Sequence, residues 1–251
     1  MTGTAARRPG VQSVDRALDV LEVLSDGGAQ GVTDIVRVTG LPLGTVHRLL
    51  ATLVDRGYVR QDAERRYAVG PATLGLADAG ERSIAAVGRV YAGRLTSLCG
   101  ETANLAVLQG HEMVYIAQSP SPHSLRIFAE VGRRVPLHST SVGKAVLAAM
   151  PVADAEALLR ATRLARSTPK TLTTLDAIAA ELDTVRRQGF AIDEEEQELG
   201  VRCVAGVVAV PGLHAALSVS GPTERFTLPK ALVVADAVRE TAEALAGALR
   251  S

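Results

Sequence analysis

The feature that most constrains the fold is the order of short elements within residues 11–70. Helical spacing of apolar residues recurs three times, and the last two helices are separated by the turn segment GLPLG at 40–44. Two strand-like pieces about a polar turn follow. This order is typical of a winged helix-turn-helix, although each helix alone would equally fit a plain three-helix bundle. The expected ranges are 11–24, 33–39 and 43–56 for the helices and 58–62 and 65–70 for the strands.

The apolar spacing also assigns a buried face to the first and third helices. Thr33 is the expected N-cap of the second helix, and Gly57 is expected to end the third. The predicted core residues are Val14, Leu18, Leu21 and Leu24 in the first helix and Val46, Leu49, Leu50 and Leu53 in the third.

If the third helix reads DNA, the residues opposite its core face are the candidates. Threonine, histidine and arginine side chains can bond base edges or phosphates, and a basic hairpin can contact phosphates or the minor groove. A lone arginine is more often a solvated surface charge, so the prediction rests on the patch as a whole. The predicted DNA-binding residues are Thr45, His47, Arg48 and Thr52 on the helix and Arg65, Arg66 and Tyr67 on the hairpin.

Composition and charge exclude several other classes of protein. The chain has 27 basic and 27 acidic residues, so it has no global attraction for polyanions. Residues 1–70 hold nine arginines and eight acidic residues, a net charge of +1, so DNA binding would need local clusters and two copies on a two-fold site. Two cysteines, Cys99 and Cys203, and scattered histidines predict no disulfide framework, metal site or cofactor. The chain lacks a signal-peptide pattern and an apolar run of ~18 residues, so we expect a cytoplasmic protein without a membrane partner.

The rest of the chain predicts a mixed α+β domain built on an antiparallel sheet. Helical spacing follows Pro71 and continues to Leu98, and Thr173 with Asp176 resembles a capping box at the start of a later helix. The run DEEEQE at 193–198 is expected to be mostly a solvated charged segment. The predicted strands are two within 103–118 and others at 125–130, 190–193, 203–210 and 215–220, and the predicted helices are 143–150, 175–187 and 229–249.

The stretch PLHSTSVGK at 136–144 allows three interpretations. Ser141 and Lys144 have the S-x-x-K spacing of penicillin-recognising serine enzymes, but the companion motifs S-D-N and K-T-G occur nowhere in the chain. Ser139, Thr140 or Ser141 can instead cap a helix that begins near Gly143. The third interpretation adds a ligand, because the free amides of a helix N-terminus attract a carboxylate.

Several stretches together resemble the IclR family of transcriptional regulators. They are VQSVDRALDVLEVL, GLPLGTVHRLLATLVDRGYVRQDAERRYAVGP, GRRVPLHSTSVGKAVLA, QGFAIDEEEQELGVRCVA and AALSVSGP, in the family's order. The resemblance implies an N-terminal winged helix-turn-helix, a linker helix, a C-terminal effector-binding domain related to GAF and PAS folds, and dimers or tetramers. Two departures are visible: Leu43-Gly44 replaces the usual Lys-Ser, and the hairpin segment around 204–222 is shorter than usual.

Carried over position by position, the resemblance implies an effector pocket. Ser141 and Val142 would supply amides, Asp193 would accept a hydrogen bond, and the two serines of LSVSG would point to one face of a strand. Apolar walls with a few polar groups suit a small organic acid. The complete expected set is Ile127, Val135, Ser141, Val142, Asp193, Val201, Cys203, Ser218 and Ser220.

The sequence therefore predicts a ligand-responsive regulator that is not an enzyme and binds a palindromic operator in double-stranded DNA. Its expected partners are operator DNA, a small organic effector and a second copy of itself. A serine hydrolase using Ser141 and Lys144 and a ligand sensor with vestigial DNA binding are the alternatives. The expected domains are a disordered tail at 1–10, the winged helix-turn-helix at 11–70, a linker helix at 71–85 and the effector domain at 86–251.

Overall fold

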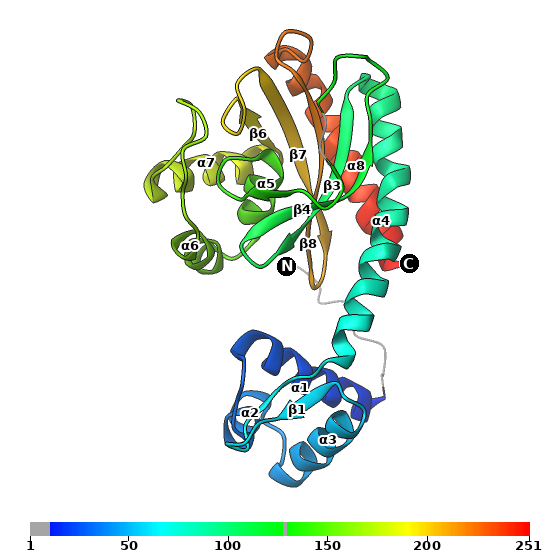
Figure 1. The fold of residues 1–251 in the computed structure, drawn as a ribbon, viewed down its shortest axis with the longest axis vertical. Helices are drawn as coiled ribbons and strands as arrows, with labels where there is room; N and C mark the ends of the chain where they lie inside the picture. The colour runs from blue at the N-terminus through cyan, green and yellow to red at the C-terminus, as the bar shows by residue number, and fades with distance from the viewer. Residues whose placement is uncertain (1–10, 128–129) are drawn as a thin grey trace, which may run out of the picture. The chain divides into compact units, whose positions relative to one another are not determined.

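The chain forms two compact units that separate at Gly80 and Glu81. The structure is a computed structural model that describes residues 11–127 and 130–251 (Figure 1). The tail expected at 1–10 lies outside the described residues. Across the described part of the chain, every helix is too short or too polar to cross a bilayer.

Three helices and a two-stranded hairpin form the first unit, as a winged helix-turn-helix requires. Gly40 adopts the left-handed conformation (φ 66°) at the end of the second helix, which makes the tight turn possible. The hairpin is antiparallel and is tied to the loop before the second helix by two backbone hydrogen bonds between Gln30 and Tyr67. The elements are α1 (Gln12–Gly27), α2 (Val32–Thr39), α3 (Leu43–Asp55), β1 (Val59–Gln61) and β2 (Tyr67–Val69).

The core of this unit agrees with the predicted face of α3 but only partly with that of α1. Val14 and Leu18 are half exposed, whereas Val20 and Leu24 are buried. The buried residues of α1 therefore lie in its C-terminal half. The predicted N-cap is also wrong, since α2 begins at Val32 after Gly31 and no side chain caps it. The buried core residues are Val20, Leu24, Ile35, Val46, Leu50, Leu53 and Val59.

The second unit contains the predicted antiparallel sheet, whose strand order is β5-β4-β3-β8-β7-β6. Every neighbouring pair in it is antiparallel. The strands are β3 (Thr102–Gln109), β4 (Glu112–Ser119), β5 (Arg134–Pro136), β6 (Ala191–Glu194), β7 (Val201–Val210) and β8 (Leu213–Pro222). The α+β fold class is therefore confirmed.

Two groups of helices cover the two faces of this sheet (Figure 1). One apolar cluster packs α4 and α8 against one face, and a second packs α5, α6 and α7 against the other. The alternation along β8 is consistent with this arrangement, because Leu217 and Val219 belong to the first cluster while Ser218 and Ser220 point to the other face. The helices are α4 (Ala72–Cys99), α5 (Ser141–Ala149), α6 (Val152–Ala161), α7 (Leu175–Gln188) and α8 (Leu228–Arg250).

Several predicted elements of this unit need correction. The described residues of 125–130 form no strand, and the strand near them is β5. Helix α7 is capped by Thr174, which accepts a hydrogen bond from the Ala177 amide, so Thr173 and Asp176 form no capping box. Helix α4 runs unbroken from Ala72 to Cys99, as the helical spacing from Pro71 to Leu98 predicts, and it continues past the linker boundary expected at 85. Helix α6 was not predicted.

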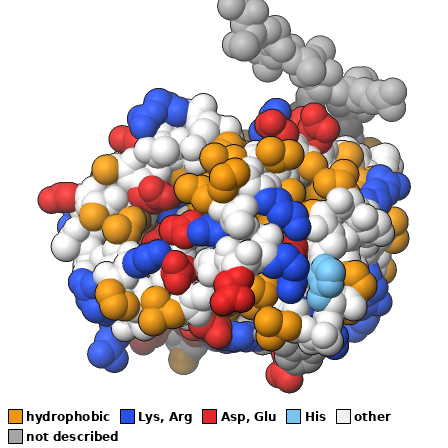
Figure 2. Space-filling model, turned by 90° about the horizontal axis from the view of Figure 1, so that it is seen from above, with side chains coloured by type: hydrophobic (Ala, Val, Ile, Leu, Met, Phe, Trp, Pro, Cys, Tyr) orange, Lys and Arg blue, Asp and Glu red, His pale blue; other side chains and the backbone are white. Residues whose placement is uncertain are grey.

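Charges of both signs are interspersed on the face of the molecule that Figure 2 shows. On the face in Figure 2, Lys and Arg side chains alternate with Asp and Glu among apolar groups, without a block of one sign. This pattern fits the equal numbers of acidic and basic residues. Binding of an anion must therefore depend on local groups.

Candidate functional sites

The first candidate site is the outward face of α3. His47, Arg48 and Thr52 are exposed there, opposite the buried Val46 and Leu50 of the same helix. The Thr52 hydroxyl donates to the Arg48 carbonyl at 3.0 Å, which leaves its oxygen free to accept. Thr45 at the start of the helix is only partly exposed. Helix α3 therefore presents one imidazole, one guanidinium and one hydroxyl to solvent on a rigid element.

The hairpin after α3 carries the remaining predicted DNA-binding residues. Asp62 shapes its tip by accepting hydrogen bonds from the Glu64 amide at 3.0 Å and the Arg66 amide at 2.8 Å. Arg65, at the tip, has a φ of 61°, a conformation that costs energy for residues with a Cβ. Arg65 and Arg66 are exposed, whereas Tyr67 is half buried and packs against the helix core.

The second candidate site is a small cavity between the sheet and the N-terminus of α5. Its accessible volume of about 40 Å³ would hold only about three water molecules. The lining side chains come from the strands, from α5 and from the loops beside them. They are Tyr115, Ile127, Arg133, Val135, Thr140, Ser141, Asp193, Gln197, Glu198, Val201, Cys203 and Ser220.

The N-terminus of α5 reaches this cavity with two free amides. Thr140 is the N-cap, so one of the three predicted caps is confirmed, and its hydroxyl oxygen accepts from the Gly143 amide at 3.2 Å. The amides of Ser141 and Val142 have no hydrogen-bond partner among the described residues. Unpaired amides at the positive end of a helix dipole favour an anion.

Asp193 is the buried acid of the cavity, with 2% of its surface exposed. Its carboxylate accepts from the amides of Glu196 at 2.8 Å and Gln197 at 3.3 Å. Burial raises the pKa of Asp193 to about 7, and the nearby Glu196 adds to the effect, while the hydrogen bond from the Glu196 amide opposes it. Asp193 can therefore donate or accept a hydrogen bond near neutral pH.

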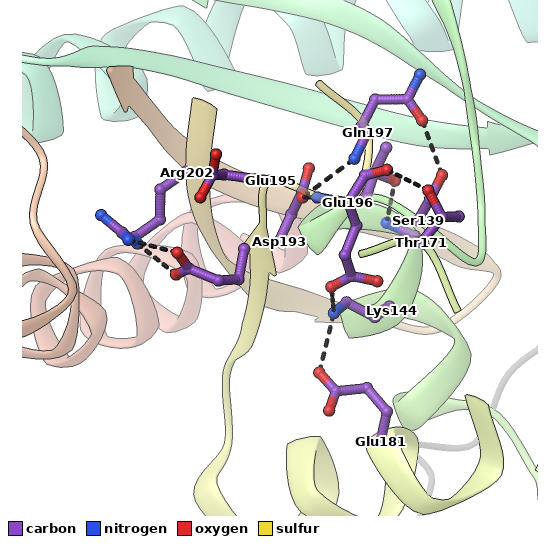
Figure 3. A network of polar contacts seen from close by, with 12 residues as sticks. Ser139, Lys144, Thr171, Glu181, Asp193, Glu195, Glu196, Gln197 and Arg202 are labelled. Atoms are coloured by element: carbon purple, nitrogen blue, oxygen red, sulfur yellow. Dashed lines mark hydrogen bonds and ion pairs between the residues drawn. The ribbon is translucent and has the colours of Figure 1, made fainter. Parts of the chain in front are cut away.

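A buried ion-pair network lies next to Asp193 and Gln197, two residues of the cavity lining (Figure 3). Lys144 is 1% exposed, and its Nζ contacts Glu196 Oε1 at 2.5 Å and Glu181 Oε1 at 2.9 Å. Burial alone would lower the pKa of Lys144, but the two carboxylates outweigh it and raise that pKa above its ordinary value. The network joins α5, α7 and the loop after β6.

This network disfavours the serine-enzyme interpretation of Ser141 and Lys144. A lysine that activates a serine must be able to take its proton. Lys144 is held protonated by two carboxylates, and the described hydrogen bonds of its ammonium group go to Glu181 and Glu196. In the structure, Lys144 ties α5 to α7 and to the loop after β6.

The structure brings together seven of the nine residues of the expected pocket. Val142 and Ser218 do not line the cavity, because the Val142 side chain packs in the apolar cluster and Ser218 lies deeper in the sheet. The run DEEEQE is not mostly solvated, since Glu196 is buried against Lys144 and the Gln197 Oε1 accepts from the Ser139 hydroxyl at 2.7 Å.

Five lining residues were not predicted from the sequence. Strand alternation could have drawn attention to Tyr115, but a register shift between Leu105 and Ala106 changes which side chains of β4 face the cavity. Gln197 and Glu198 lie close to Asp193 in the sequence, and this closeness could have indicated them, but the charged run at 193–198 predicts a solvated segment. The five are Tyr115, Arg133, Thr140, Gln197 and Glu198.

Comparison with known proteins now identifies the family. The family described as "Bacterial transcriptional regulator IclR C-terminal" matches residues 77–246, and the "IclR helix-turn-helix domain" matches residues 13–63. The chain belongs to the IclR family of transcriptional regulators. Among similar proteins, the transcriptional repressor AllR of Klebsiella pneumoniae is 35% identical over 246 residues, 96% of this chain and 90% of AllR. The regulator BhcR of Paracoccus denitrificans is 36% identical over 241 residues, 94% of this chain and 86% of BhcR.

Solved structures of IclR proteins share the fold. IclR of Thermotoga maritima superposes with a TM-score of 0.65 at 26% identity, over 95% of this chain and 99% of that one. An IclR homologue from Microbacterium hydrocarbonoxydans in complex with 4-hydroxybenzoate has a TM-score of 0.60 at 27% identity, over 95% and 99% of the two chains. This IclR-family chain is thus a DNA-binding regulator of the ligand-responsive type.

Proposed function

We propose that this IclR-family regulator binds a two-fold operator as a dimer or tetramer and changes its operator affinity when a small organic acid enters the cavity at α5. The observation that carries the proposal is the cavity itself, where two unpaired helix amides, the Arg133 side chain and a buried Asp193 surround a small space. Such a cavity suits a carboxylate with a second polar group, because it offers a guanidinium, free amides and an aspartic acid whose pKa lies near neutral pH.

The DNA half of the proposal rests on α3 and the hairpin. His47, Arg48 and Thr52 are solvent-exposed on one rigid helix, where they can reach base edges or phosphates. Arg65 occupies a left-handed tip position that glycine or asparagine would fill with less strain. A net charge of only +1 in residues 1–70 supports paired DNA-binding units on one operator.

The effector half rests on chemistry and on a relative. The anion would lie at the Ser141 and Val142 amides, with Arg133 at the rim of the cavity. The homologue from Microbacterium hydrocarbonoxydans binds 4-hydroxybenzoate, an organic carboxylate. The carboxylate class is therefore the first to test here.

Two other functions are less well supported. A serine hydrolase would need Lys144 as a base, and that lysine is paired with two carboxylates. The relatives AllR and BhcR are transcriptional regulators, so we propose that this chain performs no catalysis. A sensor with vestigial DNA binding would explain Leu43-Gly44, but the exposed His47 and Arg48 favour a functional α3.

The test is binding to the protein's own upstream intergenic DNA, measured by fluorescence anisotropy at two salt concentrations against a scrambled duplex. We expect selective binding that weakens with salt, and Arg48→Ala is expected to weaken it by about 1–3 kcal/mol. Arg160→Ala, an exposed arginine on α6, is the matched control and should leave the affinity unchanged. Equal affinity of the Arg48 variant and wild type would exclude α3 as the reading helix.

A further inference from the structure

The centre of the solvent face of α3 carries a single long basic side chain. Helical spacing places five positions of α3 on one face, and all five are exposed. The opposite face holds the buried residues that pack in the core of the unit. The five exposed positions are Gly44, Arg48, Ala51, Thr52 and Asp55.

Small residues flank Arg48 one turn away on either side. Gly44 precedes it and has open space where a Cβ would lie, and Ala51 follows it. A helix with its side chains is about 10–12 Å wide and the major groove is about 12 Å wide, so small residues on this face let the backbone approach the base edges. The carboxylate of Asp55, the last residue of α3, would repel phosphates, so the contacting part of the face ends before it.

Thr52 turns its hydroxyl hydrogen toward its own helix. Its Oγ1 donates to the Arg48 carbonyl oxygen, one turn earlier, at 3.0 Å. This bond selects one side-chain rotamer, because a β-branched residue has few staggered positions at χ1. While the bond holds, the hydroxyl cannot donate to a base, and the methyl group is left for apolar contact. The neighbouring Ala51 offers only a methyl group.

We propose that the methyl groups of Ala51 and Thr52 read thymine beside the base pair that Arg48 contacts. Among the four ordinary bases only thymine carries a methyl group in the major groove, where alanine and threonine methyl groups pack against it, and arginine pairs best with guanine. Ala51 and Thr52 lie about 4.5 and 6 Å further along the helix than Arg48, which corresponds to about one or two base-pair steps. The inference rests on the proposed function, in which α3 is the reading helix.

The first measurement defines the operator. Duplexes that bind the full-length wild-type protein are selected from a random pool and sequenced. Each half-site is expected to contain a guanine with a thymine one or two base pairs away. Half-sites without a thymine at these positions would overturn the inference.

The second measurement replaces that thymine by uracil, which removes the methyl group and keeps the base pairing. Burial of one methyl group predicts that the wild-type protein binds the uracil duplex about fourfold more weakly for each half-site, as measured by fluorescence anisotropy. Thr52→Ser keeps the hydroxyl and removes the methyl group, so the ratio of the two affinities should fall toward one. Thr52→Val keeps the methyl group and removes the hydroxyl, so the ratio should persist.

Two further variants complete the comparison. Ala51→Gly removes the other methyl group and should also lower the ratio. Both duplexes are compared within one variant, so a change in helix stability affects the two affinities equally. Thr184→Ser is the matched control, because this threonine on α7 also donates its hydroxyl to the carbonyl four positions earlier, and it should keep the wild-type ratio.

The remaining outcomes separate this inference from the proposed function. Equal affinities for the two duplexes in wild type, or a ratio that persists in Thr52→Ser and Ala51→Gly, would overturn the methyl reading and leave operator binding standing. A ratio lost in Thr52→Val and kept in Thr52→Ser would assign the reading to the hydroxyl instead. Failure to select any duplex would overturn the methyl reading together with the operator part of the proposed function.

Discussion

Lys144 illustrates at the scale of a residue how burial and charge combine in this protein. Its ammonium group is almost fully enclosed and pairs with Glu196 and Glu181. Removing one partner of a buried ionic network leaves uncompensated charge and typically costs about 3–5 kcal/mol. We therefore expect Lys144→Met to lower the free energy of unfolding by about that amount, measured by urea denaturation.

The matched control for Lys144 is Lys170. Its ammonium also contacts a carboxylate, Glu195, at 2.5 Å, but its side chain is 47% exposed. Solvent screening makes such a pair worth less than about 1 kcal/mol, so Lys170→Met should unfold nearly as wild type does. Similar losses for both variants would show that the buried network carries no special stability.

Asp193 provides a prediction about pH at the same scale. Its pKa in the folded protein is about 7 against 3.8 for the free side chain, so the folded state binds the extra proton and stability falls as pH rises between these values. In wild type we expect the free energy of unfolding to fall by an amount on the order of 2–4 kcal/mol between pH 4 and pH 8 because of this group, and we expect Asp193→Asn to abolish that fall. The measurement is the difference in urea unfolding free energy between wild type and variant across that range, and parallel curves would contradict the assignment.

At the scale of the element, α5 depends on a glycine in its first turn. A Cβ at Gly143 would lie 2.2 Å from the Leu137 carbonyl oxygen, which is backbone and cannot turn away. Gly143→Ala should therefore lower the unfolding free energy by about 2 kcal/mol, although alanine is the better helix former. Gly93→Ala in α4 has open space around it and should raise stability by up to about 1 kcal/mol. Thermal unfolding of both variants is the measurement, and a stabilised Gly143 variant would mean that the close approach is absent.

Elements with local signals were predictable, and elements set by distant contacts were not. Neighbouring residues determine three such features: the turn at Gly40, the end of α7 at Gly189 and the alternation along β8. Thr174 replaces Thr173 as a cap because adjacent threonines are equivalent in sequence and tertiary packing decides which is at the helix start. Strand β5 is only three residues long and depends on pairing with β4.

The candidate site shows the same limit. The resemblance brought Asp193, Cys203 and Ser220 together, although they are distant in the chain from Ile127 and Val135. It did not indicate Arg133, because Arg133 and Arg134 are adjacent arginines that the sequence cannot tell apart, and both are exposed. Nor did it reveal the burial of Glu196, because only Lys144, 52 positions away, makes that burial tolerable.

At the scale of the whole molecule, α4 is the one helix that contains the division between the two units at Gly80. Proline there removes a helix hydrogen bond and kinks or breaks the helix, whereas alanine preserves it. We expect Gly80→Pro to retain operator binding and carboxylate binding while the acid no longer alters operator affinity. Gly80→Ala should keep the coupling, typically ~1–3 kcal/mol, as measured by anisotropy with and without acid. Full coupling in the proline variant would mean that α4 does not transmit the signal.

Chemical modification of the buried Lys144 can report local opening of the structure around it. The chain has only three lysines, and Lys170 and Lys230 are 47% and 38% exposed while Lys144 is 1% exposed and charged. An amine-reactive reagent should therefore modify Lys170 and Lys230 quickly and Lys144 only when the segment around Glu196 detaches from α5. The rate at which Lys144 is modified, followed by mass spectrometry, would measure how often the ion pairs of Lys144 with Glu181 and Glu196 open.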